Sequence, residues 1–460
     1  MGMGQTVTSV SSTAANGTYK VGDVIPITVT FSANVTVTGT PQLTLETGST
    51  DVVVDYTSGS GTSTLTFNYM VAAGHNSSDL DFVGTGSLGL REPSFESISS
   101  KNLNSRGAAD IAIKGNYAFL VDSYFHSGGG LYIVDISDPS NPGTPIHKDT
   151  NGEALAISVN GNYAYIASYD DGLAIIDISD PTNPGTPVYR DTNGQAYDVA
   201  VNGNYAYVSD YQSGLAIIDI SDLSNIGTPV YRDTEYALSV KIKGDYAYVA
   251  DNEYGLAIID ISDPSNPGTP VYRDTDGNAQ GLTIDGDYAY VSDGGPGLAI
   301  IDISDPTNPG TPVYRDTDGN TAAITINGNY AFLGSSHQLA VIDISDPTNP
   351  GNPVYVNTER GVSGVKISGD YAFLSVGGGS GTGLVIIKAV TTDLVNSNGS
   401  RFSLQLPSPG ASNSLGANKA IVIDGTAPTV SNITASTADG SYKVGDVIAV
   451  NVVFNEIVNV

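Results

Sequence analysis

The sequence predicts an all-β fold built from one repeated unit, and three observations support this prediction. The motif Gly-Asn/Asp-Tyr-Ala occurs seven times, with gaps of 46, 42, 41, 42, 42 and 41 residues between successive tyrosines. A second motif of the type Leu-x-Ile-Ile/Val-Asp-Ile-Ser accompanies six of the seven copies. No helical period occurs within the repeats. A fixed period of this length indicates stacked copies of one supersecondary unit.

Residues 154–192 illustrate what one unit builds. Short β-rich runs alternate with turns rich in Gly, Asn, Asp and Pro, and the runs cover residues 155–159, 163–167, 173–178 and 186–189. Leu173, Ala174, Ile175 and Ile176 are apolar on both strand faces, so we expect each sheet to be covered on both sides. Radially arranged four-stranded sheets meet this requirement, which predicts a β-propeller.

The number of blades follows from counting the runs. The first three runs occur seven times, whereas the fourth run, Gly-Thr/Asn-Pro-Val/Ile, occurs only six times after them. Residues 93–97 precede the first copy and are similar to residues 270–274. We therefore expect residues 93–97 to supply the outer strand of the last blade, which closes a seven-bladed propeller over residues 92–390.

The propeller is expected to interrupt a second domain. Residues 429–433 match residues 6–10, and residues 441–448 match residues 18–25, both at an offset of 423. Residues 1–91 and 391–426 are thus predicted to form one β-sandwich and its linker, with the propeller inserted at a loop. Residues 427–460 are predicted to begin a second, incomplete module. These segments resemble the bacterial Ig-like modules of large adhesins and biofilm proteins.

The Leu-x-Ile-Ile/Val-Asp motif resembles the LVIVD-repeat family of bacterial and archaeal surface proteins, which are propellers. The resemblance covers the whole predicted propeller and rests on the seven copies described above. It implies the fold and a secreted or cell-surface location. It supplies no catalytic residues.

Composition narrows the classes of partner. The chain has 48 acidic and 18 basic residues, a net charge of −30, which disfavours nucleic acid and anionic membranes at long range. No cysteine is present and no apolar run is long enough to span a membrane. No signal peptide is visible, so we expect either that the sequence begins at a fragment boundary or that export uses a signal outside it.

Aspartates at the ends of the second strands are candidate ligand-binding residues. They are expected to lie on one face with the loops that follow the fourth strands, forming a ring of carboxylates around the central channel. The candidates are Asp122, Asp210, Asp251 and Asp293. The alternative is that they hold turns by accepting backbone N–H bonds. Carboxylate ligands would favour a hard ion such as Ca²⁺.

Tyrosines in the loops after the second strands are candidates for carbohydrate contact beside these carboxylates. They are Tyr124, Tyr169, Tyr211 and Tyr254. In the sandwich, Asp79, Asp81 and Asp424 are candidates for an inter-domain Ca²⁺ site. Two further sets of aspartates are expected to hold turns. One set precedes the Pro-rich turns, as Asp180 does, and the other lies at a strand end that looks buried, as Asp177 does.

The function predicted from these features is non-enzymatic. We expect an adhesin-like protein whose propeller is displayed on Ig-like spacers to bind protein or glycan. One alternative is a filament subunit joined by strand complementation through residues 427–460. Another is a propeller hydrolase or lyase. The blades look nearly identical except at residues 223–226 and His337, which disfavours a catalytic set in one blade.

Overall fold

The computed structural model describes residues 5–89, 94–103, 107–123, 129–150, 152–358, 360–377, 383–390, 393–395, 402–426 and 429–455. The chain divides into two compact units, Glu92–Thr391 and the combination of Met1–Arg91 with Thr392–Val460. No helix in the described part is long and apolar enough to cross a lipid bilayer.

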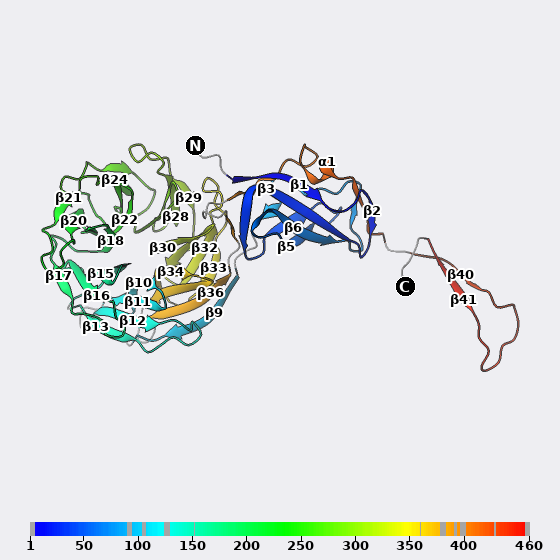
Figure 1. The fold of residues 1–460 in the computed structure, drawn as a ribbon, viewed down its shortest axis with the longest axis horizontal. Coiled ribbons are helices and arrows are strands. Elements are labelled where there is room, and N and C mark those ends of the chain that lie inside the picture. The colour runs from blue at the N-terminus through cyan, green and yellow to red at the C-terminus, as the bar shows by residue number, and fades with distance from the viewer. Residues whose placement is uncertain are drawn as a thin grey trace. The chain divides into compact units, whose positions relative to one another are not determined.

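The larger unit consists of seven four-stranded antiparallel sheets arranged around a centre, which is a propeller-like architecture (Figure 1). Their number agrees with the seven blades predicted from the repeats. The first four sheets contain β10 (Ala108–Lys114), β11 (Tyr117–Asp122), β12 (Gly130–Asp135) and β13 (Ile146–Asp149); β14 (Ala156–Asn160), β15 (Tyr163–Ala167), β16 (Leu173–Asp177) and β17 (Val188–Arg190); β18 (Asp198–Asn202), β19 (Tyr205–Ser209), β20 (Leu215–Asp219) and β21 (Val230–Arg232); and β22 (Ser239–Lys243), β23 (Tyr246–Ala250), β24 (Leu256–Asp260) and β25 (Val271–Arg273).

The last three sheets complete the ring. They contain β26 (Gly281–Asp285), β27 (Tyr288–Ser292), β28 (Leu298–Asp302) and β29 (Val313–Arg315); β30 (Thr321–Asn327), β31 (Tyr330–Ser335), β32 (Gln338–Asp343) and β33 (Val354–Asn357); and β34 (Val362–Ser368), β35 (Tyr371–Val376), β36 (Leu384–Val390) and β9 (Ser94–Lys101). In the first six sheets the strands follow the order of the chain from the centre of the ring to its outside. In the last sheet β9, which comes before all the others in the sequence, is the outermost strand.

Adjacent sheets pack face to face through alternate residues of each strand. On β15, Ala164 and Ile166 pack toward the preceding sheet, whereas Tyr165 and Ala167 pack toward the following one. Both faces of β15 are therefore buried, because successive side chains of a strand point to opposite sides. This explains why the runs are apolar throughout rather than alternating.

The last blade is closed by the two ends of the propeller segment. β9 pairs antiparallel with β36 from Ser94 opposite Val390 to Lys101 opposite Leu384. The pairing confirms the prediction that residues 94–97 belong to this outer strand, and residue 93 lies outside the described residues. The first and last sheets also share one apolar cluster, in which Ile111 lies with Phe373.

Aspartates hold the turns that connect the strands. Oδ1 of Asp177 accepts the Ser179 N–H at 2.8 Å, and Oδ1 of Asp180 accepts the Thr182 N–H at 2.9 Å. Both turn-holding predictions are confirmed, but Asp177 is exposed rather than buried. Asp177 is the C-terminal residue of β16, where its carboxylate is exposed to solvent while it accepts the hydrogen bond that holds the turn.

The smaller unit is mainly β and has one apolar core, to which the short helix α1 contributes Leu415. Its main sheet has the order β38-β1-β3-β6-β5-β4-β8, with β37 also paired to β3, and a second sheet has the order β2-β39-β7. The elements are β1 (Gln5–Ser12), β2 (Gly17–Lys20), β3 (Val24–Thr38), β4 (Gln42–Leu45), β5 (Val52–Ser58), β6 (Thr62–Met70), β7 (Asn76–Ser77), β8 (Leu88–Gly89), β37 (Asp393–Val395), β38 (Phe402–Ser403), α1 (Leu415–Asn418) and β39 (Ile421–Asp424). Both sheets thus combine strands from before and after the propeller. The Ig-like assignment remains a prediction.

The last two strands, β40 (Val430–Ala435) and β41 (Val450–Phe454), pair with each other. Their side chains are mostly exposed, among them Ile433 at 63%. Strand complementation through this segment remains an untested prediction.

Two glycines in the loops of one blade differ in how much space surrounds them. Gly203 and Gly214 both have positive φ, +57° and +75°. A Cβ at Gly203 meets open space, whereas one at Gly214 falls 2.4 Å from the Arg232 carbonyl oxygen. We expect Gly203→Ala to lower the free energy of unfolding by about 1 kcal/mol, the intrinsic penalty of the left-handed conformation. Gly214→Ala should lose more than about 2 kcal/mol because backbone must also move. Urea denaturation of both variants measures this, and equal losses would contradict the packing.

Candidate functional site

The loops after the second strands and the segments that lead into the next blade lie side by side on one face of the propeller. Isolated antiparallel bridges join Tyr169 to Ala196, Tyr211 to Ala237 and Asn252 to Ala279. Each bridge connects the loop of one blade to the segment just before the first strand of its neighbour. This face therefore brings together residues that lie 26 or 27 positions apart in the sequence, in agreement with the expectation that these loops share a face.

The four candidate aspartates do not form an exposed ring of carboxylates on this face. Asp122 is 4% exposed, and Asp210, Asp251 and Asp293 are fully buried. Oδ1 of Asp210 accepts the Thr192 hydroxyl at 2.6 Å, and its Oδ2 accepts the Gly194 N–H at 2.8 Å. The alternative interpretation is thus the one that the geometry supports, since these carboxylates hold the loop that leads from the preceding blade into their own.

The same arrangement recurs in the following blades. Asp251 accepts the N–H groups of Glu235 and Tyr236, and Asp293 accepts the Thr275 hydroxyl and the Gly277 N–H. Burial raises the pKa of Asp210, Asp251 and Asp293, and these hydrogen bonds oppose the rise. The carboxylates fasten blades together rather than present oxygen atoms to a ligand.

A continuous row of five tyrosine rings crosses this face. The ring centroids are separated by 5.8, 5.3, 5.4 and 6.3 Å along the order Tyr169, Tyr197, Tyr211, Tyr236 and Tyr254. These residues, here called the tyrosine row, come from three consecutive blades. All five are partly exposed, with Tyr254 at 39%.

Two members of the row have strained backbones. Tyr169 and Tyr211 have φ of 44° and 47°, in the left-handed region that bulky residues rarely adopt. The equivalent positions of the next two blades carry Asn252 and Gly294, residue types that adopt this conformation at low energy. Strain of this kind costs about 1 kcal/mol or more and often marks a functional position. The loop itself does not require tyrosine.

The sequence prediction found part of the tyrosine row. Tyr169, Tyr211 and Tyr254 belong to it, whereas Tyr124 lies outside the described residues. Tyr197 and Tyr236 were missed because they lie in a different loop, just before the first strand of the next blade. Their presence in two successive blades was the available signal.

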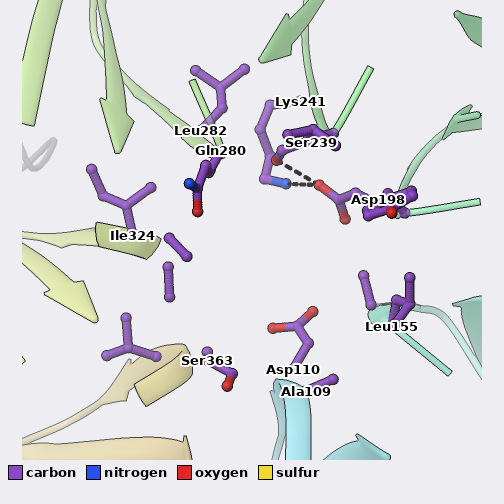
Figure 2. A pocket seen from close by; sticks show the side chains of 18 of the residues that line it. Ala109, Asp110, Leu155, Asp198, Ser239, Lys241, Gln280, Leu282, Ile324 and Ser363 are labelled. Atoms are coloured by element: carbon purple, nitrogen blue, oxygen red, sulfur yellow. Dashed lines mark hydrogen bonds and ion pairs between the residues drawn. The ribbon is translucent and has the colours of Figure 1, made fainter. Parts of the chain in front are cut away.

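A cavity of about 150 Å³ lies in the central channel of the propeller, and Figure 2 shows its lining. The first strands of all seven blades contribute to it. At the register position seven residues before each repeat tyrosine, five blades have a small residue, whereas two have Asp110 and Asp198. Two positions later, Lys241 and Lys366 are the charged residues. Tyr197 of the tyrosine row also lines the cavity.

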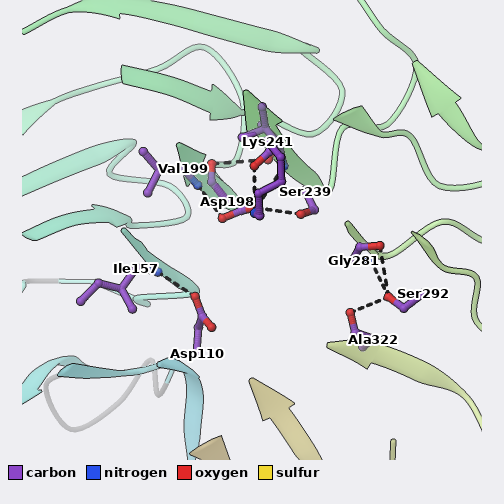
Figure 3. A network of polar contacts seen from close by, with 11 residues as sticks. Asp110, Ile157, Asp198, Val199, Ser239, Lys241, Gly281, Ser292 and Ala322 are labelled. Carbon is purple, nitrogen blue, oxygen red and sulfur yellow. Dashed lines mark hydrogen bonds and ion pairs between the residues drawn. The ribbon is translucent and has the colours of Figure 1, made fainter. Parts of the chain in front are cut away.

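Asp198 and Lys241 form a closed polar network on the wall of the channel (Figure 3). Oδ2 of Asp198 accepts bonds from Lys241 Nζ at 2.8 Å, Ser239 Oγ at 2.7 Å and the Val240 N–H at 3.0 Å. Burial alone would raise the pKa of Asp198, but the Lys241 ammonium and these hydrogen bonds outweigh it and hold the pKa below its ordinary value. This pair is ionised and already satisfied.

Asp110, unlike Asp198, has no ion-pair partner among the described residues. Its Oδ2 accepts the Ile157 N–H at 3.0 Å, and its side chain projects toward the middle of the cavity (Figure 2). Burial raises its pKa, and the Asp198 carboxylate adds to the rise, while Lys366 and the Ile157 N–H oppose it. Oδ1 lies only 2.7 Å from where a Cβ of Gly364 would be, so the neighbouring blade needs glycine there.

The sequence prediction overlooked these four charged residues. It named residues 223–226 and His337 as the departures from the repeat, whereas the channel departs from it at Asp110, Asp198, Lys241 and Lys366. Alignment of the seven first strands on their tyrosines contained this signal. Only the fold indicates that these positions meet in one cavity.

The proposed calcium ligands of the smaller unit are only partly brought together. Carboxylate oxygens of Asp79 and Asp81 both lie beside Gly416. Asp81 accepts the Phe82 and Gly410 N–H groups, whereas Asp424 accepts the Thr426 N–H. Within the described ranges, no three His, Asp or Glu residues form a group that could hold a metal ion.

Seven segments match the LVIVD repeat, at residues 105–147, 151–188, 193–228, 235–271, 276–313, 318–358 and 359–404, which together make up more than half of the chain. The chain belongs to the LVIVD repeat family. This LVIVD repeat protein has no match among curated proteins.

A solved structure supports the fold. The crystal structure of the WD40 β-propeller domain of Doa1 matches with a TM-score of 0.50 and 7% sequence identity, over 64% of this chain and 96% of that chain. At this identity, the similarity extends to the fold alone. The β-propeller prediction is thereby confirmed.

The buried aspartates predict a pH dependence of stability. Because the folded-state pKa of Asp210 is raised, the folded protein binds more protons than the unfolded protein between the two pKa values. We expect the free energy of unfolding of the wild type, relative to Asp210→Asn, to fall as the pH rises above about 4. Urea denaturation at several pH values measures it.

A matched control has the opposite sign. Hydrogen bonds from Ser221 lower the pKa of Asp219. The stability of the wild type relative to Asp219→Asn should therefore fall as the pH is reduced below about 4. The same slope for both variants would contradict the assignment.

Calcium addition separates the two interpretations of the aspartates. A Ca²⁺ site with a Kd one-hundredth of the free Ca²⁺ concentration would add about 2.7 kcal/mol of stability. Because Asp81, Asp210, Asp251 and Asp293 already accept hydrogen bonds from the protein, we expect millimolar Ca²⁺ to leave the Tm of EDTA-treated protein within about 1 °C. Differential scanning calorimetry measures the shift. A saturable rise of several degrees would restore the calcium hypothesis.

Proposed function

We propose that the propeller is a non-enzymatic glycan-binding module, in which the tyrosine row is the binding surface. The observation that supports this proposal most strongly is the uninterrupted row of five partly exposed rings from three blades. Aromatic rings offer a large apolar face together with a hydroxyl group, which suits the mixed apolar and hydroxylated surface of a sugar. An elongated row suits an extended chain better than a compact ligand.

Charge around the row favours neutral or cationic glycans. Burial raises the pKa of Tyr197, with neighbouring tyrosines and Glu153 adding to it, and the Glu235 carboxylate is the main cause of the raised pKa of Tyr254. These hydroxyl groups therefore stay protonated and can donate to sugar oxygens at neutral pH. With a net charge of −30, the chain repels sulfated or phosphorylated polymers.

The strained tyrosines support a role in binding. Tyr169 and Tyr211 keep a ring on the row at a backbone position where Asn or Gly would be less strained. A residue retained for stability alone would not need this conformation. The rings are therefore interpreted as ligand contacts rather than as loop structure.

The setting of this module remains part of the proposal. We infer a secreted or cell-surface, adhesin-like protein in which Ig-like modules act as spacers for the propeller. The support is the similarity of the flanking segments to such modules and the combination of strands from both sides of the propeller in one sheet. Protease treatment of intact cells would test surface exposure, and a propeller protected until lysis would contradict it.

Substitution of Tyr211 by Asn tests the binding role. The variant copies Asn252 of the next blade, so relief of backbone strain offsets the loss of ring contacts and the stability should stay within about 1 kcal/mol of wild type. Binding of neutral glycans on a glycan array, followed by calorimetry, should weaken at least tenfold, or about 1.4 kcal/mol.

The control is Tyr355→Ala. Tyr355 is 37% exposed, close to the 39% of Tyr254, and belongs to β33 outside the row. Its loss should leave glycan binding unchanged. If the wild type binds no glycan, or if both variants weaken binding equally, the proposal fails; selective capture of a purified protein ligand would indicate the other class of partner.

A further inference from the structure

We propose that the central channel holds the terminal sugar residue of the glycan whose chain lies on the tyrosine row. This inference rests on the proposed function and assigns a second part of the binding site. Four observations carry it: the size of the cavity, its charge balance, the free hydrogen-bonding groups, and the tyrosine that it shares with the row.

The size of the cavity fits one small polar group. About 10–15 Å³ is needed to hold one water, and sites for drug-sized ligands occupy roughly 300 Å³ or more. The cavity of about 150 Å³ lies between these limits. Its size therefore suits one sugar ring better than a drug-sized ligand.

The charges of the cavity favour an uncharged ligand. Two aspartates and two lysines line it, so their formal charges cancel. The Asp198–Lys241 ion pair is already satisfied by internal hydrogen bonds. Neither a cation nor an anion would gain a net attraction from the cavity as a whole.

Asp110 and Lys366 provide the groups that remain for a ligand. Asp110 projects toward the middle of the cavity, and among the described residues no carboxylate lies within ion-pair distance of Lys366. Gln280 and Ser363 add neutral donors and acceptors to the same lining. A sugar hydroxyl matches this set because it donates to a carboxylate and accepts from an ammonium group at once.

Tyr197 belongs both to the lining of the cavity and to the tyrosine row. It lines the cavity, and its ring contacts both Tyr169 and Tyr211. A chain that follows the row therefore has a route for its end into the channel. The propeller would then recognise chain ends in addition to the chain itself.

Two variants of the full chain test the assignment. Asp110→Asn keeps the shape and the bond from Ile157 but removes the carboxylate, and Lys366→Met keeps the apolar stem but removes the ammonium. Calorimetry with the tetrasaccharide that binds best on a neutral glycan array should give at least a tenfold weaker Kd for each variant. Lys243→Met, which removes an exposed lysine paired with Asp287, is the matched control and should bind as the wild type.

A second measurement is a competition experiment, made on the wild type and on two variants. Glucose, galactose, mannose and N-acetylglucosamine are titrated singly against the wild-type protein with that tetrasaccharide bound. The terminal monosaccharide should compete, and Asp110→Asn should abolish the competition while Tyr211→Asn should retain it.

The outcomes separate the two proposals. If Tyr211→Asn weakens binding while Asp110→Asn and Lys366→Met bind as the wild type, the tyrosine row binds glycan and the channel assignment is wrong. Failure of every monosaccharide to compete would also overturn the channel assignment. If no glycan binds the wild type, both proposals fail together.

Discussion

The structure depends on the need to cover both faces of every sheet in the propeller. Each blade has apolar side chains on both sides, so no blade can be stable without a neighbour on each side. The alternate packing of Ala164 and Tyr165 into different clusters illustrates this dependence. Only a closed ring covers all the faces, and the pairing of β9 with β36 provides the closure.

Closure creates the channel and gives it a particular chemistry. The first strand of each sheet is an edge strand that lines the channel. Its N–H groups on that edge have no neighbouring strand to pair with and need other acceptors. Asp110 and Asp198 meet this need by accepting the N–H groups of Ile157 and Val240 in the next blade. The same residues place carboxylates in a narrow space, where Lys241 and Lys366 balance their charge. A structural requirement of the ring has thus produced a polar cavity.

On the face that carries the tyrosine row, polar residues have a different role from those of the channel. Buried aspartates such as Asp210 fasten each loop to the next blade, which leaves the exposed surface to the tyrosines. Because the loops are fixed by these bonds, the five rings are held in a defined order before any ligand arrives. Preorganisation of this kind reduces the entropy lost on binding. The strained conformations of Tyr169 and Tyr211 are tolerated because the bridges to Ala196 and Ala237 hold the loops.

The sequence by itself determined the repeat, the four strands of each unit, the number of blades and the closing strand, because these follow from periodicity and local patterns. It also indicated Tyr169, Tyr211 and Tyr254. The tertiary structure alone decided that Asp210, Asp251 and Asp293 are buried, since burial depends on the neighbouring blade. It likewise joined Tyr197 and Tyr236 to the row, and placed Asp110 and Lys366 in one cavity although 256 positions separate them. Contacts between blades are set by ring closure, which local sequence patterns do not encode.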